Sequence, residues 1–391
     1  MCSRVVTSRC VRVLLDYRSA LRSRSGVGEY AHELVRALVG LSETPASGPP
    51  LELTIFSSSW KDRLQPDSSL SGIDAIDLRI PVAALNFAWH RLGRPSVERL
   101  TGRRFEVTHS LHPLLMPARA AARVVTIHDL HFMAHPERTQ GEIRRDYRAL
   151  APTHARKADH VIVNSHYTAG EVIRQFSVPS EHVSVCAPGA PDWQPRAPVP
   201  GSGYLLFLGT LEPRKNIGTL LDAYERLLAS RATGTTPDLV LAGQATGAAG
   251  PWLERLTRAP LAGHVRHLGY VDESKRRQVY EGARALVIPS FHEGFGIPVL
   301  EAMAIGVPVI AASSGALPEV LGDAGLLIDP QDSSAFATAM ARLLDEDGLA
   351  SHCAHAGVER ARMFRWPETA RRVCEAYARA YERFRAQAER H

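Results

Sequence analysis

Two glutamates that lie eight positions apart are, by residue type and spacing, the residues of this chain that most strongly suggest a chemical function. Glu293 and Glu301 lie in the segment 285–301, ALVIPSFHEGFGIPVLE, where an apolar strand-like run precedes a Gly-rich loop and a helix that begins near Pro298. The free N–H groups of a helix start suit a phosphate. Because carboxylates repel phosphate, we expect the glutamates to accept hydrogen bonds from sugar or ribose hydroxyls. Taken singly, Glu301 could merely complement the helix dipole, and Glu293 could be a solvated loop residue.

A pair of adjacent cations follows another apolar run, in the segment 205–216, LLFLGTLEPRKN. We predict a strand that reaches Gly209, a loop that carries Arg214 and Lys215, and Asn216 as the N-cap of the next helix. Two cations at the carboxyl end of a strand can bind a diphosphate and stabilise it as it leaves. The alternative is a solvated basic pair on the surface.

The remainder of the chain alternates short apolar runs with helical patterns, which predicts an α/β protein with parallel sheets. The stretch 187–203 is rich in Pro, Gly and Ser and separates two such series. We predict a first domain over 1–190, a linker over 191–203, a second domain over 204–366 and a helix over 367–391. Ligands of such sheets bind at the carboxyl ends of the strands, so the loops there hold the candidate site.

Composition and charge narrow the class of protein. The chain has 391 residues, of which 45% are hydrophobic and 22% charged, as in globular proteins of two or three domains. It has no run of about 18 apolar residues and no secretory signal pattern, and its five scattered cysteines suit a reducing compartment, so we expect a cytoplasmic protein. The net charge of +5 is concentrated in the first half, which suits an anionic partner such as a membrane surface. We expect no nucleic-acid partner and no bound metal, because no recognition module or zinc-ligand spacing is present.

These motifs resemble the retaining GT-B glycosyltransferases of family 4, whose E-x7-E spacing is matched by Glu293 and Glu301. The run that follows, EAMAIGVPVIAASSGALPEVLGDAGLLIDP, resembles that family as well. Three segments of the first half resemble it more loosely: Gly26–Leu34, Val124–Phe132 and Val161–Thr168. The resemblance implies two Rossmann-like domains that face each other across a cleft, and a C-terminal helix that crosses back to pack on the first domain. It also implies a nucleotide-sugar donor on the second domain, an acceptor on the first, and no metal or other cofactor.

The resemblance assigns a role to each candidate site residue. It implies that Arg214 and Lys215 contact the donor diphosphate, that Glu293 binds the donor sugar, and that Glu301 binds the ribose. It places His128, which ends a strand of the first domain, opposite the donor sugar, so that His128, Arg214, Lys215 and Glu293 form the catalytic set. Further donor contacts are implied for Gly28, Gly209, Gly294, Phe295, Gly296 and Ile297. From the residues alone, His128 could equally be a buried, hydrogen-bonded histidine.

Acceptor contacts are expected in the first half of the chain. Arg18, Arg22 and Arg24 could bind an anionic acceptor such as a lipid diphosphate, although a solvated basic loop explains them equally well. Asp129 could assist the acceptor or simply form a turn. Apolar residues at 87–90 and 114–116, near Arg91 and Arg94, suit a membrane surface or the core of the domain.

A competing motif is G-x-G-x-x-A at Gly26, Gly28 and Ala31, which matches the dinucleotide fingerprint. Ten residues separate it from the preceding strand, whereas the fingerprint requires an immediate turn. The next strand ends near Phe56 and has no acidic residue after it to bind a ribose. Both features argue against a nicotinamide cofactor here.

Together the motifs predict a retaining hexosyltransferase that moves a sugar from a nucleotide diphosphate to an acceptor hydroxyl in bacterial glycan or glycolipid synthesis. Mannose from GDP-mannose is the expected donor, because Gly26–Leu34 and His128–Glu137 look most like bacterial mannosyltransferases, while UDP-sugars stay open. Peripheral attachment to the inner face of the membrane is part of the same expectation. The alternatives are an NAD-dependent oxidoreductase that uses Gly26–Ala31, and a non-catalytic protein that binds nucleotide sugars.

Overall fold

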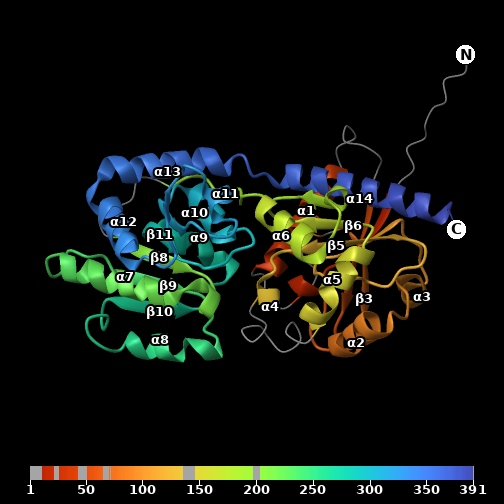
Figure 1. Cartoon of the computed structure of the whole chain (residues 1–391), viewed down its shortest axis with the longest axis horizontal. Coiled ribbons are helices and arrows are strands. Elements are labelled where there is room, and N and C mark those ends of the chain that lie inside the picture. The colour runs from red at the N-terminus through yellow and green to blue at the C-terminus, as the bar shows by residue number, and fades with distance from the viewer. Residues whose placement is uncertain are drawn as a thin grey trace, which may run out of the picture. The chain divides into compact units, whose positions relative to one another are not determined.

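The computed structural model describes residues 11–21, 26–42, 51–64, 70, 72–134, 146–196 and 203–390. The chain forms two compact units, each built on its own sheet (Figure 1). The first spans 1–189 together with 365–391, and the second spans 190–364. Both are Rossmann-like α/β domains, as the alternating pattern predicts. Arg22 and Arg24, two of the predicted acceptor residues, lie outside the described part of the chain.

The first unit contains a seven-stranded parallel sheet in the order β3-β2-β1-β4-β5-β6-β7. Its inner strand β1 is buried on both faces over 13–16, as expected when helices cover both sides of a parallel sheet. Val13 of β1 lies opposite Leu53 of β2 and Val107 of β4. The strands are β1 (Val11–Asp16), β2 (Leu51–Ser58), β3 (Asp74–Leu78), β4 (Val107–Ser110), β5 (Ala122–Ile127), β6 (His160–Val163) and β7 (Val183–Val185).

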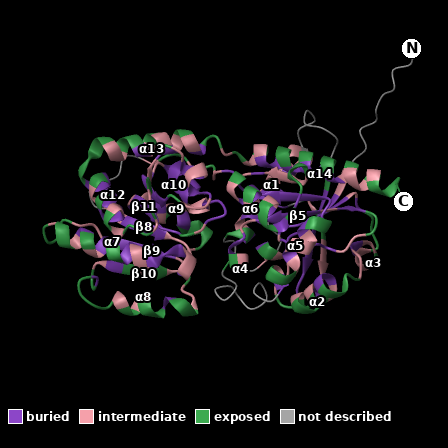
Figure 2. Ribbon diagram, viewed as in Figure 1, coloured by how far each residue is buried: buried purple, intermediate pink, exposed green. Residues whose placement is uncertain are grey.

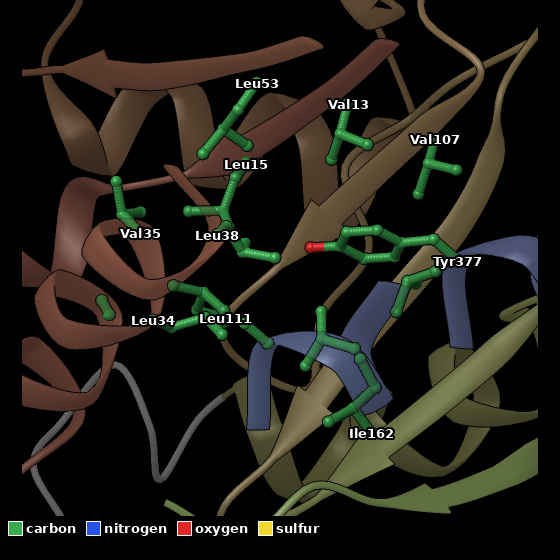
Figure 3. Close-up of a cluster of buried hydrophobic side chains, with 14 of the residues drawn as sticks. Val13, Leu15, Leu34, Val35, Leu38, Leu53, Val107, Leu111, Ile162 and Tyr377 are labelled. Carbon is green, nitrogen blue, oxygen red and sulfur yellow. The ribbon is translucent and has the colours of Figure 1, made fainter. Parts of the chain in front are cut away.

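Helices cover this sheet and bury apolar side chains against it. Figure 3 shows Tyr377 of the C-terminal helix in one core with Leu38 and Leu111, beside the first strands of the sheet. Figure 2 shows that the strands are largely buried, whereas exposed residues lie along the outer faces of the helices. The helices of this unit are α1 (Val27–Ser42), α2 (Val82–Leu92), α3 (Val97–Thr101), α4 (His131–Ala134), α5 (Arg148–Lys157), α6 (His166–Phe176) and α14 (Trp366–Ala388).

Helix α14 returns to the first unit, far along the sequence from its other elements. The Tyr377 hydroxyl lies 2.8 Å from Nδ1 of the buried His109, whose Nε2 lies 2.8 Å from the hydroxyl of Thr126. At the start of the helix, the Thr369 hydroxyl donates to the carbonyl of Ala187. These buried polar contacts fix the position of α14 on the sheet, since an unpaired polar group there would be costly.

The second unit contains a six-stranded parallel sheet in the order β10-β9-β8-β11-β12-β13. Its strands are β8 (Tyr204–Leu208), β9 (Leu239–Ala242), β10 (Val265–Gly269), β11 (Ala283–Ile288), β12 (Val309–Ala312) and β13 (Leu326–Ile328). Its helices are α7 (Ile217–Ser230), α8 (Gly250–Arg255), α9 (Glu273–Glu281), α10 (Ile297–Ile305), α11 (Leu317–Leu321), α12 (Ser333–Asp345) and α13 (Asp347–Ala361). β8 and β11 are neighbours in this sheet, so the loops after them start side by side.

The predicted linker over 191–203 differs from the structure in its first residues. Residues 190–196 belong to the second unit, and Arg196 anchors them there. Its Nη1 donates to the carbonyls of Glu281 and Ala283 at 2.8 and 2.5 Å, and its backbone N–H donates to Ile305. The Arg196 guanidinium thus donates to carbonyls at the end of a helix and binds this segment to the second unit. The Pro-rich composition of the segment suggests a free linker instead.

Among the residues that the structure describes, no helix is both long and apolar enough to span a membrane.

Candidate active site

Two neighbouring strands of the second unit bring the predicted cations and the first glutamate to one place. Arg214 and Lys215 lie in the loop after β8, and Glu293 lies in the loop after β11. Two hydrogen bonds join these loops: the Phe291 N–H donates to the carbonyl of Arg214, and the side-chain amide of Asn216 donates to that of Pro289. Asn216 does occupy the N-cap position of α7, but its side chain joins loops instead of capping the backbone, which corrects one detail of the expected role.

Three donors converge on the carboxylate of Glu293. Lys215 Nζ lies 2.5 Å from Oε1, and the Ser290 hydroxyl donates to the same oxygen at 2.7 Å. Arg214 Nη1 donates to Oε2 at 3.3 Å, while Arg214 Nε donates to Glu212 at 2.6 Å. Glu293 and Lys215 are both more than nine-tenths buried. The expected alternative of a solvated loop residue and a solvated basic pair is therefore wrong for Glu293 and Lys215.

The charges of this cluster oppose the effect of burial. Burial by itself would raise the pKa of Glu293, but Lys215 and Arg214, followed by their hydrogen bonds and that of Ser290, lower it to about 2. Burial and the neighbouring Arg214 lower the pKa of Lys215, and Glu293 opposes that change. Glu293 is consequently an ionised, hydrogen-bond-accepting group at neutral pH. Such a group can accept hydroxyl donors from a ligand.

Two glycines lie beside the cluster, and Gly315 gives it the room that it needs. A Cβ on Gly315, which has φ +59°, would lie 2.6 Å from the Glu293 carbonyl oxygen and 2.8 Å from its nitrogen. The Ala316 N–H donates to that carbonyl, so the segment after β12 supports the Glu293 backbone. Gly209 lies beside Lys215, where a Cβ would be 3.8 Å from Lys215 Nζ, an ordinary van der Waals distance.

The Gly-rich loop between Glu293 and α10 presents its backbone, not its large side chain. The ring of Phe295 is buried and packs edge-on against Phe364, with centroids 5.7 Å apart. Gly296 has φ +111° and is followed by Ile297, the first residue of α10, so Pro298 is the second helical residue. Pro298 has no N–H, and the Val299 N–H donates to the Gly296 carbonyl, so at this helix start the Ile297 N–H and the positive end of the helix dipole can bind an anion. Donor contacts of Gly294, Phe295, Gly296 and Ile297 stay predictions.

Glu301 lies further along α10 and makes its contacts with α9. Arg276 Nη1 donates to Oε1 at 2.7 Å and the Tyr280 hydroxyl donates to Oε2 at 2.8 Å, all three residues being buried. Burial raises the pKa of Glu301, and Arg276 and Tyr280 oppose that rise. The structure thus gives Glu301 a more specific setting than a helix-dipole role. Its contact with a ribose stays a prediction, and a ribose hydroxyl would join two donors already present.

His128 lies at the end of β5 in the first unit, with both ring nitrogens close to protein groups. Nε2 lies 3.1 Å from the Leu111 carbonyl and Nδ1 lies 2.9 Å from the Asn164 amide nitrogen. This pairing fits a neutral ring that carries its proton on Nε2. Burial lowers the pKa of His128 to about 4, with the Leu111 contact and Asp129 acting in the opposite direction. His128 is partly buried and hydrogen-bonded at both nitrogens, and a contact with the donor sugar stays a prediction.

The other candidates of the first unit have distinct settings. Arg18 donates to both oxygens of the buried Asp16, at 2.8 and 2.6 Å, and its guanidinium lies 5.1 Å from the Trp89 ring. A buried, charge-neutralised Arg18 cannot serve as an exposed anion clamp, which corrects that expectation. Asp129 accepts from the His131 N–H at 3.0 Å, as a turn former does, and its acceptor role stays a prediction. Gly28 lies in the first turn of α1.

The sequence reasoning did not identify Ser290, Arg276, Tyr280, Asn164 and Gly315 as residues near the site. For two of them a signal existed: Arg276 and Tyr280 are four positions apart in a helix and therefore share a face. The contact of Ser290 with Glu293 lies within one loop without a regular spacing, and Asn164 and Gly315 depend on contacts between separate loops or strands. No local pattern indicates such contacts.

Comparison with known proteins agrees with this arrangement. Residues 24–193 match the protein family described as Glycosyltransferase Family 4, and residues 202–346 match Glycosyl transferases group 1. The chain is 30% identical over 374 residues to the O-antigen chain mannosyltransferase B of Escherichia coli, which covers 90% of this chain and 96% of that protein. It is 34% identical over 248 residues to a D-inositol 3-phosphate glycosyltransferase 2 of Catenulispora acidiphila, covering 59% and 58% of the two chains.

Solved structures share the fold at low sequence identity. A sucrose-phosphate synthase from Thermosynechococcus elongatus superposes with a TM-score of 0.75 at 20% identity, over 94% of this chain and 98% of that one. The Anabaena protein HepE, solved with UDP and glucose, gives a TM-score of 0.66 at 18% identity, over 93% and 98%. The fold is GT-B, as the motifs predict, and the NAD-dependent alternative is wrong. The chain belongs to glycosyltransferase family 4.

Proposed function

We propose that this glycosyltransferase moves a hexose, mannose from GDP-mannose, to an acceptor hydroxyl, with retention at the anomeric carbon. The observation that carries the proposal is the buried Glu293 carboxylate held among Lys215, Arg214 and Ser290 at the carboxyl ends of β8 and β11. A carboxylate of this kind suits sugar hydroxyls, and the two cations suit the diphosphate that leaves. The acceptor is a glycan or glycolipid of a bacterial cell.

The geometry supports a division of labour during transfer. Lys215 and Arg214 stabilise negative charge as the bond to the diphosphate breaks, and the start of α10 adds the Ile297 N–H and the positive end of its dipole. Glu293 orients the sugar through its hydroxyls, and Glu301 orients the ribose. Because protein cations supply the charge, transfer needs no bound metal. We place no side chain as a nucleophile, so attack on the face of the departing phosphate is the route we propose.

Mannose is proposed because the E. coli relative that aligns over nearly its whole length is named a mannosyltransferase. HepE, whose structures hold UDP and glucose, supports a nucleotide-sugar donor in this fold and keeps UDP-sugars as the second candidate. A thermal-shift screen of GDP, UDP, ADP and TDP separates the two. We expect GDP to raise the melting temperature most, with transfer of labelled mannose from GDP-mannose that persists in the presence of a chelator. A larger shift with UDP would refute the GDP assignment.

We also propose that the first unit contacts an anionic bilayer surface through one face of α2. Phe87 and Leu92 are 60% and 53% exposed, and Arg94 lies beside them in the sequence as an exposed residue. Arg91 is exposed as well, and one of its guanidinium nitrogens pairs with Asp146 at 2.7 Å. Exposed apolar side chains interleaved with cations suit a membrane interface. Five of the candidate residues do not take part, because they are buried: Trp89, His90, Leu114, Leu115 and Met116. Core packing is therefore the correct interpretation for those residues.

The change Phe87→Glu tests this surface. We expect it to lower binding to vesicles that contain phosphatidylglycerol by roughly tenfold, because it removes an apolar contact and adds a repelled charge. Co-sedimentation with those vesicles measures the binding. Met363→Glu is the matched control, because Met363 is 68% exposed in the second unit. Equal loss in both variants, or no loss in either, would contradict the assignment to α2.

A further inference from the structure

Ser290 occupies a particular place among the three donors to Glu293. It lies two residues after the end of β11, is fully buried, and donates its hydroxyl to Glu293 Oε1 at 2.7 Å. Lys215 and Arg214, the other two donors, are the cations that the proposed function assigns to the diphosphate. Ser290 is neutral and its bond to Glu293 closes within one loop. Of the three donors, Ser290 is therefore the one that the proposed function does not also assign to the diphosphate.

The two oxygens of Glu293 are unequally held. Oε1 accepts the short contacts from Ser290 and Lys215, at 2.7 and 2.5 Å. Oε2 accepts from Arg214 at 3.3 Å, which is long for a charge-assisted bond. A diphosphate competes with Glu293 for the hydrogen-bond donors of both cations, whereas the Ser290 hydroxyl continues to donate to Oε1. Oε2 is then the oxygen that receives a hydroxyl of the sugar.

The backbone around Ser290 is fixed from the neighbouring loop. The Ser314 hydroxyl donates to the Ser290 carbonyl at 2.7 Å, and the Ala316 N–H donates to the Glu293 carbonyl at 3.0 Å. Gly315 lies between these two contacts, against the backbone of Glu293. The segment after β12 therefore holds both ends of the bond between Ser290 and Glu293. A hydroxyl on so rigid a support defines the direction of the carboxylate that it binds.

We propose that Ser290 is a positioning residue for sugar transfer, acting through Glu293; this inference rests on the proposed function. The change Ser290→Ala should lower kcat by about tenfold or more, because a hydrogen bond to a charged group is lost and the sugar is misplaced. The KM for the donor should change by less than about threefold, since the cations still bind the diphosphate. Ser290→Thr keeps the hydroxyl and should restore most of kcat.

The decisive measurement is a double-mutant cycle with Glu293→Gln. If Ser290 acts through the Glu293 carboxylate, adding Ser290→Ala to Glu293→Gln should change the residual transfer by less than about twofold. A loss in that background equal to the loss in the wild type would overturn the proposal, as would an unchanged kcat in Ser290→Ala. Ser290→Cys, close in volume and a weak donor, replaces the alanine variant in the cycle if that variant unfolds.

Ser58→Ala is the matched control, since Ser58 is a fully buried serine of the first unit whose hydroxyl donates to the Ile80 carbonyl at 2.8 Å. It should lower the melting temperature and leave kcat unchanged, and an equal fall in kcat there would count against a role specific to Ser290. The outcomes also separate the two proposals. A wild type that transfers no hexose from any nucleotide sugar refutes the proposed function. Full activity in Ser290→Ala, alongside an active wild type and an impaired Glu293→Gln, refutes only the role of Ser290.

Discussion

Glu293→Gln should abolish most of the sugar transfer, lowering kcat by about a hundredfold or more, while binding of the nucleoside diphosphate persists. The pKa of Glu293 is lowered to about 2, so the wild-type group is ionised at every pH at which the enzyme would be assayed. The amide keeps the size but replaces one acceptor oxygen by a donor, and misplacement of a reacting sugar costs about this factor. Transfer of labelled hexose measures kcat, and calorimetry with GDP measures the dissociation constant.

Binding of the diphosphate should survive because the change removes an anion from beside the cations. In the wild type, Glu293 pairs with Lys215 at 2.5 Å and with Arg214 at 3.3 Å. Without that carboxylate, both cations are available to phosphate oxygens. Loss of GDP binding with intact folding would contradict the role given to Glu293, and so would wild-type turnover. Glu319→Gln is a suitable control, because that glutamate lies in the first turn of α11 and has no role in the proposed transfer.

Lys215→Ala should lower kcat on the order of a hundredfold, because one preorganised charge at a leaving group contributes about that much. Lys215 is buried and its ammonium group is held by Glu293, so its position is fixed before the substrate arrives. The dissociation constant for GDP should rise as well, since the same cation binds the diphosphate before and after transfer. Steady-state transfer assays and GDP calorimetry give the two quantities.

The control for this change is Lys275→Ala, which removes an exposed lysine of α9. It should leave both quantities as in the wild type. Lys215→Arg tests whether charge alone suffices, and we expect a partial loss because the longer, planar guanidinium does not fit the same buried position. Full turnover in Lys215→Ala would remove this residue from the mechanism and leave the leaving group to Arg214 and the start of α10.

The sequence by itself determined the fold class, and it indicated the residues of the candidate site in the second unit. Apolar runs such as Tyr204–Leu208 and Leu239–Ala242 are the strands that the structure contains, because strands buried on both faces of a parallel sheet are apolar throughout. The spacing of Glu293 and Glu301, with glycines between them, indicated a loop that leads into a helix. Strands and loops of this kind are local properties of the chain, so a pattern of neighbouring residues is enough to predict them.

Other elements have weaker signals in the sequence and did not follow from it. Strand β3 lies at the edge of its sheet and carries Asp74 and Asp77, so it has no continuous apolar run. The start of the second unit did not follow from the sequence either. The hydrogen bonds of the Arg196 guanidinium hold a segment whose Pro-rich composition is typical of a linker. In each case a polar residue satisfied by a distant partner contradicts what the composition suggests.

Only the tertiary structure decided which side chains meet. Lys215 reaches Glu293 because β8 and β11 are adjacent in the sheet, although 78 residues separate them in sequence. Arg18 is drawn to Asn86 and the ring of Trp89 in α2, and Glu301 is held by Arg276 and Tyr280 of α9. The physical reason is that strand order and burial determine the partners of a charged group. A buried charge must find a partner wherever the fold brings one, and spacing along the chain does not reveal it.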